Sequence, residues 1–201
     1  MSKGAIVLDA DGVLLDYNRA YAQVWAQVFG TIPHEKNPNA YWALDRWAVD
    51  RLEGESLTRF RNAFDESFWG NIPAVEGSKA ACKALNQTGY DLICVTALPA
   101  KFQQARRQNL IQLGFPIDIV HTVDHSEGDV SPKAALINAL KPVAFVDDFL
   151  PYLVGINRET HSALILRETD QSPNAWALLS HASSQHANLK IFAKWWLNQN
   201  Q

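Results

Sequence analysis

The sequence has few cysteines, no long apolar run and no leader-like start. Its two cysteines, Cys82 and Cys94, are isolated from one another in apolar segments, so neither a disulfide framework nor a cysteine-based metal site is expected. No apolar run approaches the roughly 20 residues that a membrane-spanning helix needs. Only a short apolar run precedes Asp9, unlike a usual signal peptide. These features favour a cytoplasmic protein with reduced cysteines and no membrane partner.

Charged residues are also sparse, at 19% of the 201 residues, and the formal net charge is −3 at pH 7. Lysine and arginine are scattered instead of forming a basic run or stripe, so we expect no nucleic-acid partner. Hydrophobic residues make up 47% of the chain, which is typical of a chain that folds around a buried core. This length predicts one domain with room for a small insertion. The oligomeric state stays open.

Short apolar segments alternate with helical patterns over most of the chain. Apolar runs rich in branched side chains predict strands over 5–8, 90–97, 117–123, 142–147 and 162–167. Helical spacing with glycine or proline at the ends predicts helices over 77–88, 99–113, 132–140, 150–158 and 187–198. The apolar face of the last helix would carry Ile191, Phe192, Trp195 and Trp196. This alternation predicts an α/β fold, a doubly wound parallel sheet covered on both faces.

The segment 17–73 interrupts the alternation because it contains no strand pattern. Helical spacing predicts helices over 17–30, 41–49 and 56–68, with a proline-containing loop over 31–39. We therefore predict an α/β core of residues 1–16 and 74–201, with a small helical cap of residues 17–73 inserted after the first strand. Most aromatic residues of this segment are expected to form its own core, and the others are candidates for the substrate cleft. These residues are Trp25, Tyr41, Trp42, Trp47, Phe60, Phe64, Phe68 and Trp69.

Two carboxylates follow the first predicted strand. Asp9 and Asp11 come directly after the apolar run 5–8 and are followed by Gly12, a residue that permits a tight turn. Two like charges this close together are costly unless a cation lies near them. Carboxylate oxygens suit a hard divalent ion such as Mg2+. Taken alone, however, this stretch is equally compatible with an ordinary solvated acidic turn.

Two further predicted strand ends and one predicted helix start carry polar residues where an open α/β sheet binds its ligands, beyond the carboxyl ends of the strands. Thr96 lies at the end of one predicted strand, and Asp147 and Asp148 end another. Lys133 lies at the start of a helix, where a cation is unfavourable against the helix dipole unless an anion is near. Each residue alone has an ordinary structural explanation, such as helix capping by the aspartates. Together they predict a site that holds Mg2+ and a phosphate.

The run Ile6–Asp16 resembles the first motif of the haloacid dehalogenase-like hydrolase superfamily, in its phosphatase branch. Thr96, Lys133 and the pair Asp147-Asp148 follow in the order of that family. The helical segment lies where the family inserts a C1-type helical cap. The resemblance covers residues 5–166 and implies a Rossmann-like core below a cap.

The resemblance also implies Mg2+-dependent hydrolysis of a phosphomonoester of a small metabolite through an aspartyl-phosphate. Asp9 would be the nucleophile, and Asp11 would protonate the leaving oxygen and then activate water. Mg2+ would be held by Asp9, by Asp11 through its backbone carbonyl, and by the pair Asp147-Asp148, with Asp147 favoured as the direct ligand.

Gly12, Thr96 and Lys133 would contact the phosphate, with Lys133 neutralising charge. The dehalogenase branch lacks an acid at the position of Asp11, so we do not expect dehalogenation. Ala97 follows Thr96 where many relatives carry asparagine, and this difference leaves the substrate class open.

Other interpretations remain at this point. A phosphotransferase or sugar-phosphate mutase would use the same residues with a hydroxyl in place of water. A catalytically silent phosphate-binding or regulatory protein would keep the fold without turnover. His121, Asp124 and His125 could form a transition-metal cluster, but they lack the helical spacing that would bring both imidazoles onto one ion. Candidates for a second anionic group of the substrate are Arg19, Arg46, Arg51, Arg59 and Arg61.

Overall fold

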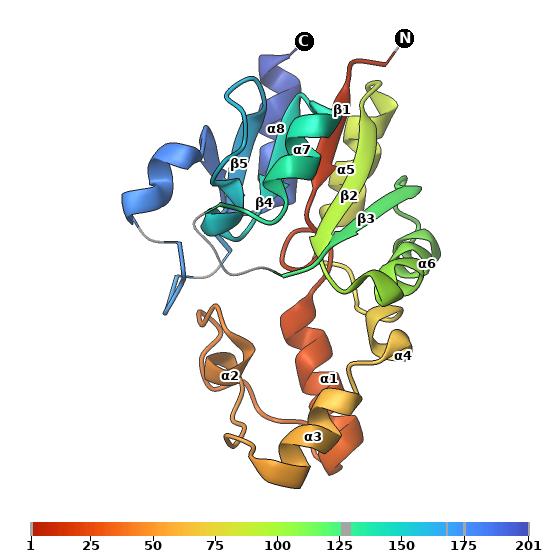
Figure 1. The fold of residues 1–201 in the computed structure, drawn as a ribbon, viewed down its shortest axis with the longest axis vertical. Coiled ribbons are helices and arrows are strands. Elements are labelled where there is room, and N and C mark those ends of the chain that lie inside the picture. The colour runs from red at the N-terminus through yellow and green to blue at the C-terminus, as the bar shows by residue number, and fades with distance from the viewer. Residues whose placement is uncertain (1, 126–129, 168, 175, 201) are drawn as a thin grey trace.

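A computed structural model of the chain describes residues 2–125, 130–167, 169–174 and 176–200. Within these residues, six strands form one parallel sheet in the order β3-β2-β1-β4-β5-β6 (Figure 1). The strands are β1 (Ala5–Leu8), β2 (Asp91–Ala97), β3 (Ile119–Val123), β4 (Ala144–Asp147), β5 (His161–Ile165) and β6 (Ser184–His186). The order changes direction at β1, which creates a topological switch point between β1 and β4. The predicted doubly wound parallel sheet is confirmed.

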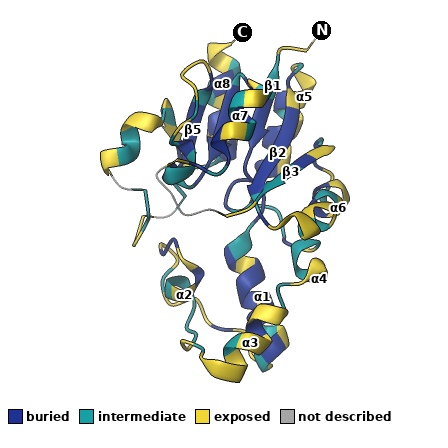
Figure 2. Ribbon diagram, in the orientation of Figure 1, coloured by how far each residue is buried: buried dark blue, intermediate teal, exposed yellow. Residues whose placement is uncertain are grey.

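Successive side chains of each strand point to opposite faces of the sheet, so both faces are apolar and both are covered by helices. On β1, Ile6 and Leu8 point into one buried cluster and Val7 points into the other. The first cluster is closed by α5 (Ser78–Gln87), α6 (Gln103–Leu113) and α8 (Leu189–Gln199). The second is closed by α7 (Ala134–Leu140) and the short helix η2 (Leu150–Leu153). Figure 2 shows the central strands buried between these layers.

The segment 17–73 lies beyond the carboxyl ends of the central strands, as Figure 1 shows. It contains α1 (Tyr17–Phe29), α2 (Ala43–Arg46), α3 (Gly54–Asn62) and α4 (Glu66–Trp69). Tyr21, Trp25 and Phe60 belong to a buried cluster of its own. We call residues 17–73 the helical segment. The part of the chain that the structure describes contains no candidate membrane-spanning helix.

Two helices of the helical segment are shorter than predicted. Only Ala43–Arg46 of the predicted helix 41–49 is helical, because Tyr41 and Trp47 form contacts outside it: the Tyr41 hydroxyl donates to Asp148, and Trp47 Nε1 donates to the carbonyl of Asn18. The predicted helix 56–68 is divided into α3 and α4. Asp65 causes this break, because its side chain accepts a hydrogen bond from the Phe68 amide and so caps a new helix.

The region after β4 also differs from the prediction. The predicted helix 150–158 is the single 3-10 turn Leu150–Leu153, and Gly155, with φ +86°, follows it in a left-handed conformation. Strand β6 and the 3-10 helix η3 (Trp176–His181) were not predicted. The polar sequence Ser184–His186 lacks the apolar pattern of a strand, and its pairing with β5 defines it instead.

Helix α8 buries one side of its predicted apolar face. Leu189, Phe192, Ala193 and Trp196 are buried and recur at the spacing of one helical stripe. Ile191 is 46% exposed, so its predicted place on the buried face is wrong. Adjacent residues of a helix point about 100° apart, which separates Ile191 from the stripe.

These two neighbours provide a test of the docking of α8. We expect Phe192→Ala to lower the free energy of unfolding by about 3–5 kcal/mol, because it leaves a cavity in the core. Ile191→Ala is the matched control and should change it by less than about 1 kcal/mol. Urea denaturation of both variants provides the measurement, and equal effects would contradict this packing of α8.

Candidate active site

Lys133 joins two buried carboxylates at the carboxyl edge of the sheet. Its Nζ donates to Asp9 Oδ1 at 2.6 Å and to Asp147 Oδ2 at 2.7 Å. Burial raises the pKa of Asp9 well above its usual value, although the Lys133 cation opposes this shift. Burial likewise raises the pKa of Asp147 to about 6. Burial alone would lower the pKa of Lys133, but Asp147 and Asp9 raise it above its ordinary value. Lys133 is therefore a fixed positive charge beside Asp9.

Strand pairing explains why these residues meet. Leu8 of β1 is in register with Val146 of β4, and the Asp9 amide donates to the Val146 carbonyl at 2.9 Å. The next residues of the two strands, Asp9 and Asp147, therefore lie side by side. Lys133 is at the N-terminus of α7, which packs on one face of the sheet through Ile137.

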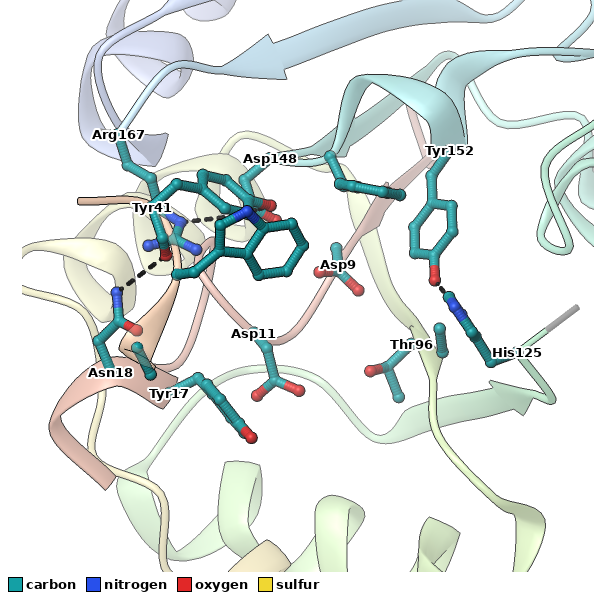
Figure 3. A pocket seen from close by; sticks show the side chains of 14 residues that line it. Asp9, Asp11, Tyr17, Asn18, Tyr41, Thr96, His125, Asp148, Tyr152 and Arg167 are labelled. Atoms are coloured by element: carbon teal, nitrogen blue, oxygen red, sulfur yellow. Dashed lines mark hydrogen bonds and ion pairs between the residues drawn. The ribbon is translucent and has the colours of Figure 1, made fainter. Parts of the chain in front are cut away.

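Asp148 turns toward a cavity and is held from two sides. Its Oδ2 accepts hydrogen bonds from Arg167 Nε at 2.6 Å and from the Tyr41 hydroxyl at 3.1 Å. The Arg167 guanidinium lies over the Tyr41 ring, 4.4 Å from its centre. Figure 3 shows Tyr41, Arg167 and Asp148 together at one side of the cavity. A residue of the helical segment thus contacts an acidic residue of the core.

Gly12 is required by this arrangement. Its φ is +84°, and a Cβ at this position would collide with the Asp148 carboxylate and would lie 2.6 Å from Arg167 Nε. Glycine therefore allows the turn after Asp11 to pass directly beside Asp148. Its predicted contact with a phosphate stays a prediction.

Asp11 forms an ion pair with an arginine that the sequence analysis did not identify. Arg106 Nη2 lies 2.9 Å from Asp11 Oδ2, and the Arg106 side chain is fully buried beneath the Trp69 ring at 5.3 Å. Its Nε and Nη1 have no hydrogen-bond partner among the described residues. Burial raises the pKa of Asp11, and Arg106 lowers it. Asp11 is thus the acidic partner of this buried cation among the described residues.

The arrangement fits a divalent cation. Among the described residues, one carboxylate oxygen each from Asp9, Asp147 and Asp148 lie within 4.8 Å of one another. Both oxygens of Asp147 already accept hydrogen bonds, one from Lys133 and one from the Phe149 amide. Asp148 lines the cavity together with Asp9. The geometry therefore favours Asp148 as the residue that would contact an ion, in place of Asp147, the direct ligand expected from the sequence.

A cavity of about 310 Å3 opens above the acids. Asp9, Asp11, Thr96 and Asp148 contribute to its wall, as Figure 3 shows. Thr96 is buried at the end of β2, as predicted. The structure thus brings together the predicted residues Asp9, Asp11, Thr96, Lys133, Asp147 and Asp148.

Other candidates from the sequence lie in different surroundings. His125 lines the cavity, where its Nδ1 is 2.7 Å from the Tyr152 hydroxyl, but the described residues show no metal-binding group of His125 with His121 and Asp124. Among the five candidate arginines, Arg51 lines a cavity that Asp11 also lines, whereas Arg46 pairs with Glu35.

The pair Asp11–Arg106 gives a stability prediction. Asp11→Asn removes the counter-charge of a buried guanidinium, so we expect the free energy of unfolding to fall by about 3 kcal/mol, the lower end for such pairs because Asp11 is partly exposed. Adding Arg106→Met should recover most of this loss. Arg107→Met, at the adjacent position, should cost less than about 1 kcal/mol. Denaturant titrations of the set measure this, and an Asp11→Asn variant as stable as the wild type would contradict the assignment.

Comparisons with known proteins agree with the fold. A family model described as haloacid dehalogenase-like hydrolase matches residues 3–151, whereas the comparison with curated proteins gives no significant match. A hydrolase of this family from Deinococcus radiodurans R1, with bound phosphate and sodium, is 16% identical, with coverage of 98% of this chain and 96% of that one and a TM-score of 0.59.

Two other solved structures are similar in fold. A proposed β-phosphoglucomutase from Thermotoga maritima is 17% identical, with coverage of 98% and 99% of the two chains and a TM-score of 0.60. A predicted phosphoglycolate phosphatase from Haemophilus somnus 129PT is 17% identical, with coverage of 98% and 97% and a TM-score of 0.63. These identities show a shared fold alone, but the family model covers most of the chain. The chain belongs to the haloacid dehalogenase-like hydrolase family.

Proposed function

We propose that this protein is a Mg2+-dependent phosphomonoester hydrolase that acts on a small phosphorylated metabolite. The observation that carries this proposal is the buried Lys133, which holds Asp9 at 2.6 Å at the edge of a cavity that Asp11 also lines. A nucleophile, a fixed positive charge and a second acid are thus gathered at one point. The family assignment and the phosphate bound in the Deinococcus relative support a phosphorylated substrate.

In the first step, a carboxylate oxygen of Asp9 attacks the phosphorus atom. The bond between phosphorus and the ester oxygen breaks, and an aspartyl-phosphate forms. The leaving oxygen takes a proton from the Asp11 carboxyl group. Burial, which raises the pKa of Asp11, favours the protonated form needed for this step.

In the second step, water attacks the phosphorus atom of the aspartyl-phosphate. Asp11, now a carboxylate, accepts a proton from that water. The bond between phosphorus and the Asp9 oxygen breaks, which releases phosphate and restores Asp9. The ion pair with Arg106 stabilises the carboxylate form of Asp11 that this step requires.

Asp9, Asp148 and the backbone carbonyl of Asp11 would hold Mg2+. The cation supplies charge that shields the carboxylate nucleophile from an anionic substrate. Lys133 and the Thr96 hydroxyl would bind phosphoryl oxygens, and Gly12 keeps the backbone close to them. Asp147, engaged by Lys133 and by the Phe149 amide, would orient Lys133.

The helical segment would act as a cap that excludes bulk water during the reaction. Backbone hydrogen bonds tie it to the core: the Tyr41 amide donates to the Asp170 carbonyl, and the Asp170 amide donates to the Asn39 carbonyl. The Asn37 side chain also donates to the Asp170 carboxylate at 3.0 Å. A cap attached beside Asp148 would close directly over the acids.

A phosphotransferase or mutase is the second candidate, because the Thermotoga relative is a proposed β-phosphoglucomutase. In that case a substrate hydroxyl would replace water in the second step. Product analysis in the presence of sugar phosphates separates the two reactions. A catalytically silent binding protein would bind phosphate but would show no metal-dependent release of phosphate from an ester.

The proposal is tested by phosphate release from a panel of phosphomonoesters, with Mg2+ and with a chelator. We expect wild-type turnover that depends on Mg2+ and that Asp9→Asn abolishes, because an amide cannot form the aspartyl-phosphate. Asp118→Asn, which changes an exposed aspartate, should retain activity. Turnover that survives Asp9→Asn, or that a chelator leaves unchanged, would contradict the proposal.

A further inference from the structure

The cavity continues from the acids into a second hollow lined largely by aromatic side chains. This hollow has a volume of about 610 Å3 and extends from Asp11 over Tyr17, Trp42, Trp69 and Tyr152. A ligand pocket typically has a volume of about 300–1,000 Å3. Because Asp11 would protonate the leaving oxygen, this hollow is where the alcohol part of the substrate would lie.

The hollow offers few positively charged groups that would bind a strongly anionic leaving group. Besides Asp11 and His125, its described lining contains one further acidic residue, Asp45, and one basic residue, Arg51. Aromatic walls instead favour a flat ring, which stacks on them.

Trp42 is placed for such stacking and does not belong to the core of the helical segment. It is 46% exposed, whereas Trp25 and Phe60 are buried in that core. Its ring meets Tyr41 edge-on, with centroids 4.9 Å apart, and Tyr41 is itself held by Asp148 and stacks with Arg167. Tyr41 is thus fixed beside Asp148. This contact positions the indole of the next residue, Trp42, at the wall of the hollow.

We infer that the substrate is a phosphomonoester whose alcohol carries a flat aromatic or heteroaromatic ring, an inference that rests on the proposed function. The phosphate lies at Asp9 and Lys133, and the ring stacks on Trp42 in the hollow. The substrate class that this geometry selects includes aryl phosphates and nucleoside monophosphates. Sugar phosphates and glycerol phosphates lack the ring and gain nothing from the indole.

The test compares phenyl phosphate and nucleoside 5′-monophosphates with glucose 6-phosphate and glycerol phosphate. We expect kcat/KM to be at least about tenfold higher for the ring-bearing esters, since one aromatic stack contributes roughly a factor of 10 or more. Trp42→Ala should raise KM for these esters by about tenfold and leave the ring-free esters unchanged. Trp42→Phe should recover most of the loss. The matched control is Trp176→Ala, which changes a tryptophan that is 89% exposed and outside the hollow.

Equal or better turnover of the ring-free esters would overturn the inference and leave the phosphatase proposal intact. If no ester is hydrolysed, the phosphatase proposal fails. The binding of two phosphonates then tests whether the hollow selects an aromatic ring. Phenylphosphonate, which cannot be hydrolysed, should bind the wild type more tightly than methylphosphonate, and Trp42→Ala should remove the difference. Equal affinity of the two phosphonates for the wild type would overturn the inference.

Discussion

The contact of Lys133 with Asp9 and Asp147 is the interaction on which the rest of the site depends. Four acidic side chains gather at the switch point of the sheet, where burial and then repulsion from Asp147, Asp148 and Asp11 raise the pKa of Asp9. Lys133 opposes this repulsion at 2.6 and 2.7 Å and links β1, β4 and the start of α7. A buried charge that loses its partner costs about 3–5 kcal/mol. The proposed catalytic role of Lys133 and its contribution to the stability of the fold therefore depend on the same two contacts.

Much of the core and its acidic edge could be predicted from the sequence. Parallel strands bring their carboxyl ends to one edge, so Asp9, Thr96 and Asp147 had to lie near one another once their strands were identified. Strand β6 could not be predicted, because its polar sequence is defined by pairing with β5. The break between α3 and α4 depends on a cap by Asp65 inside a continuous helical pattern.

The residues that support the site could not be predicted from the sequence for a different reason. Arg106 and Arg107 are adjacent in α6, and only the rotation of that helix decides which one is buried against Asp11. The contact of Tyr41 with Asp148 joins residues far apart in the chain through an irregular loop. The same loop holds Trp42 outside the core of the helical segment. Tertiary packing thus places some aromatic residues of the helical segment in its core and others at the wall of the cavity.

The most direct test of the account is to identify the phosphorylated residue during turnover. The reaction is stopped with acid, the protein is reduced with borohydride, which converts an aspartyl-phosphate to homoserine, and its peptides are analysed by mass spectrometry. The account predicts conversion of Asp9 that requires both substrate and Mg2+. Conversion at another residue, or turnover with an unmodified Asp9 under the same conditions, would contradict it.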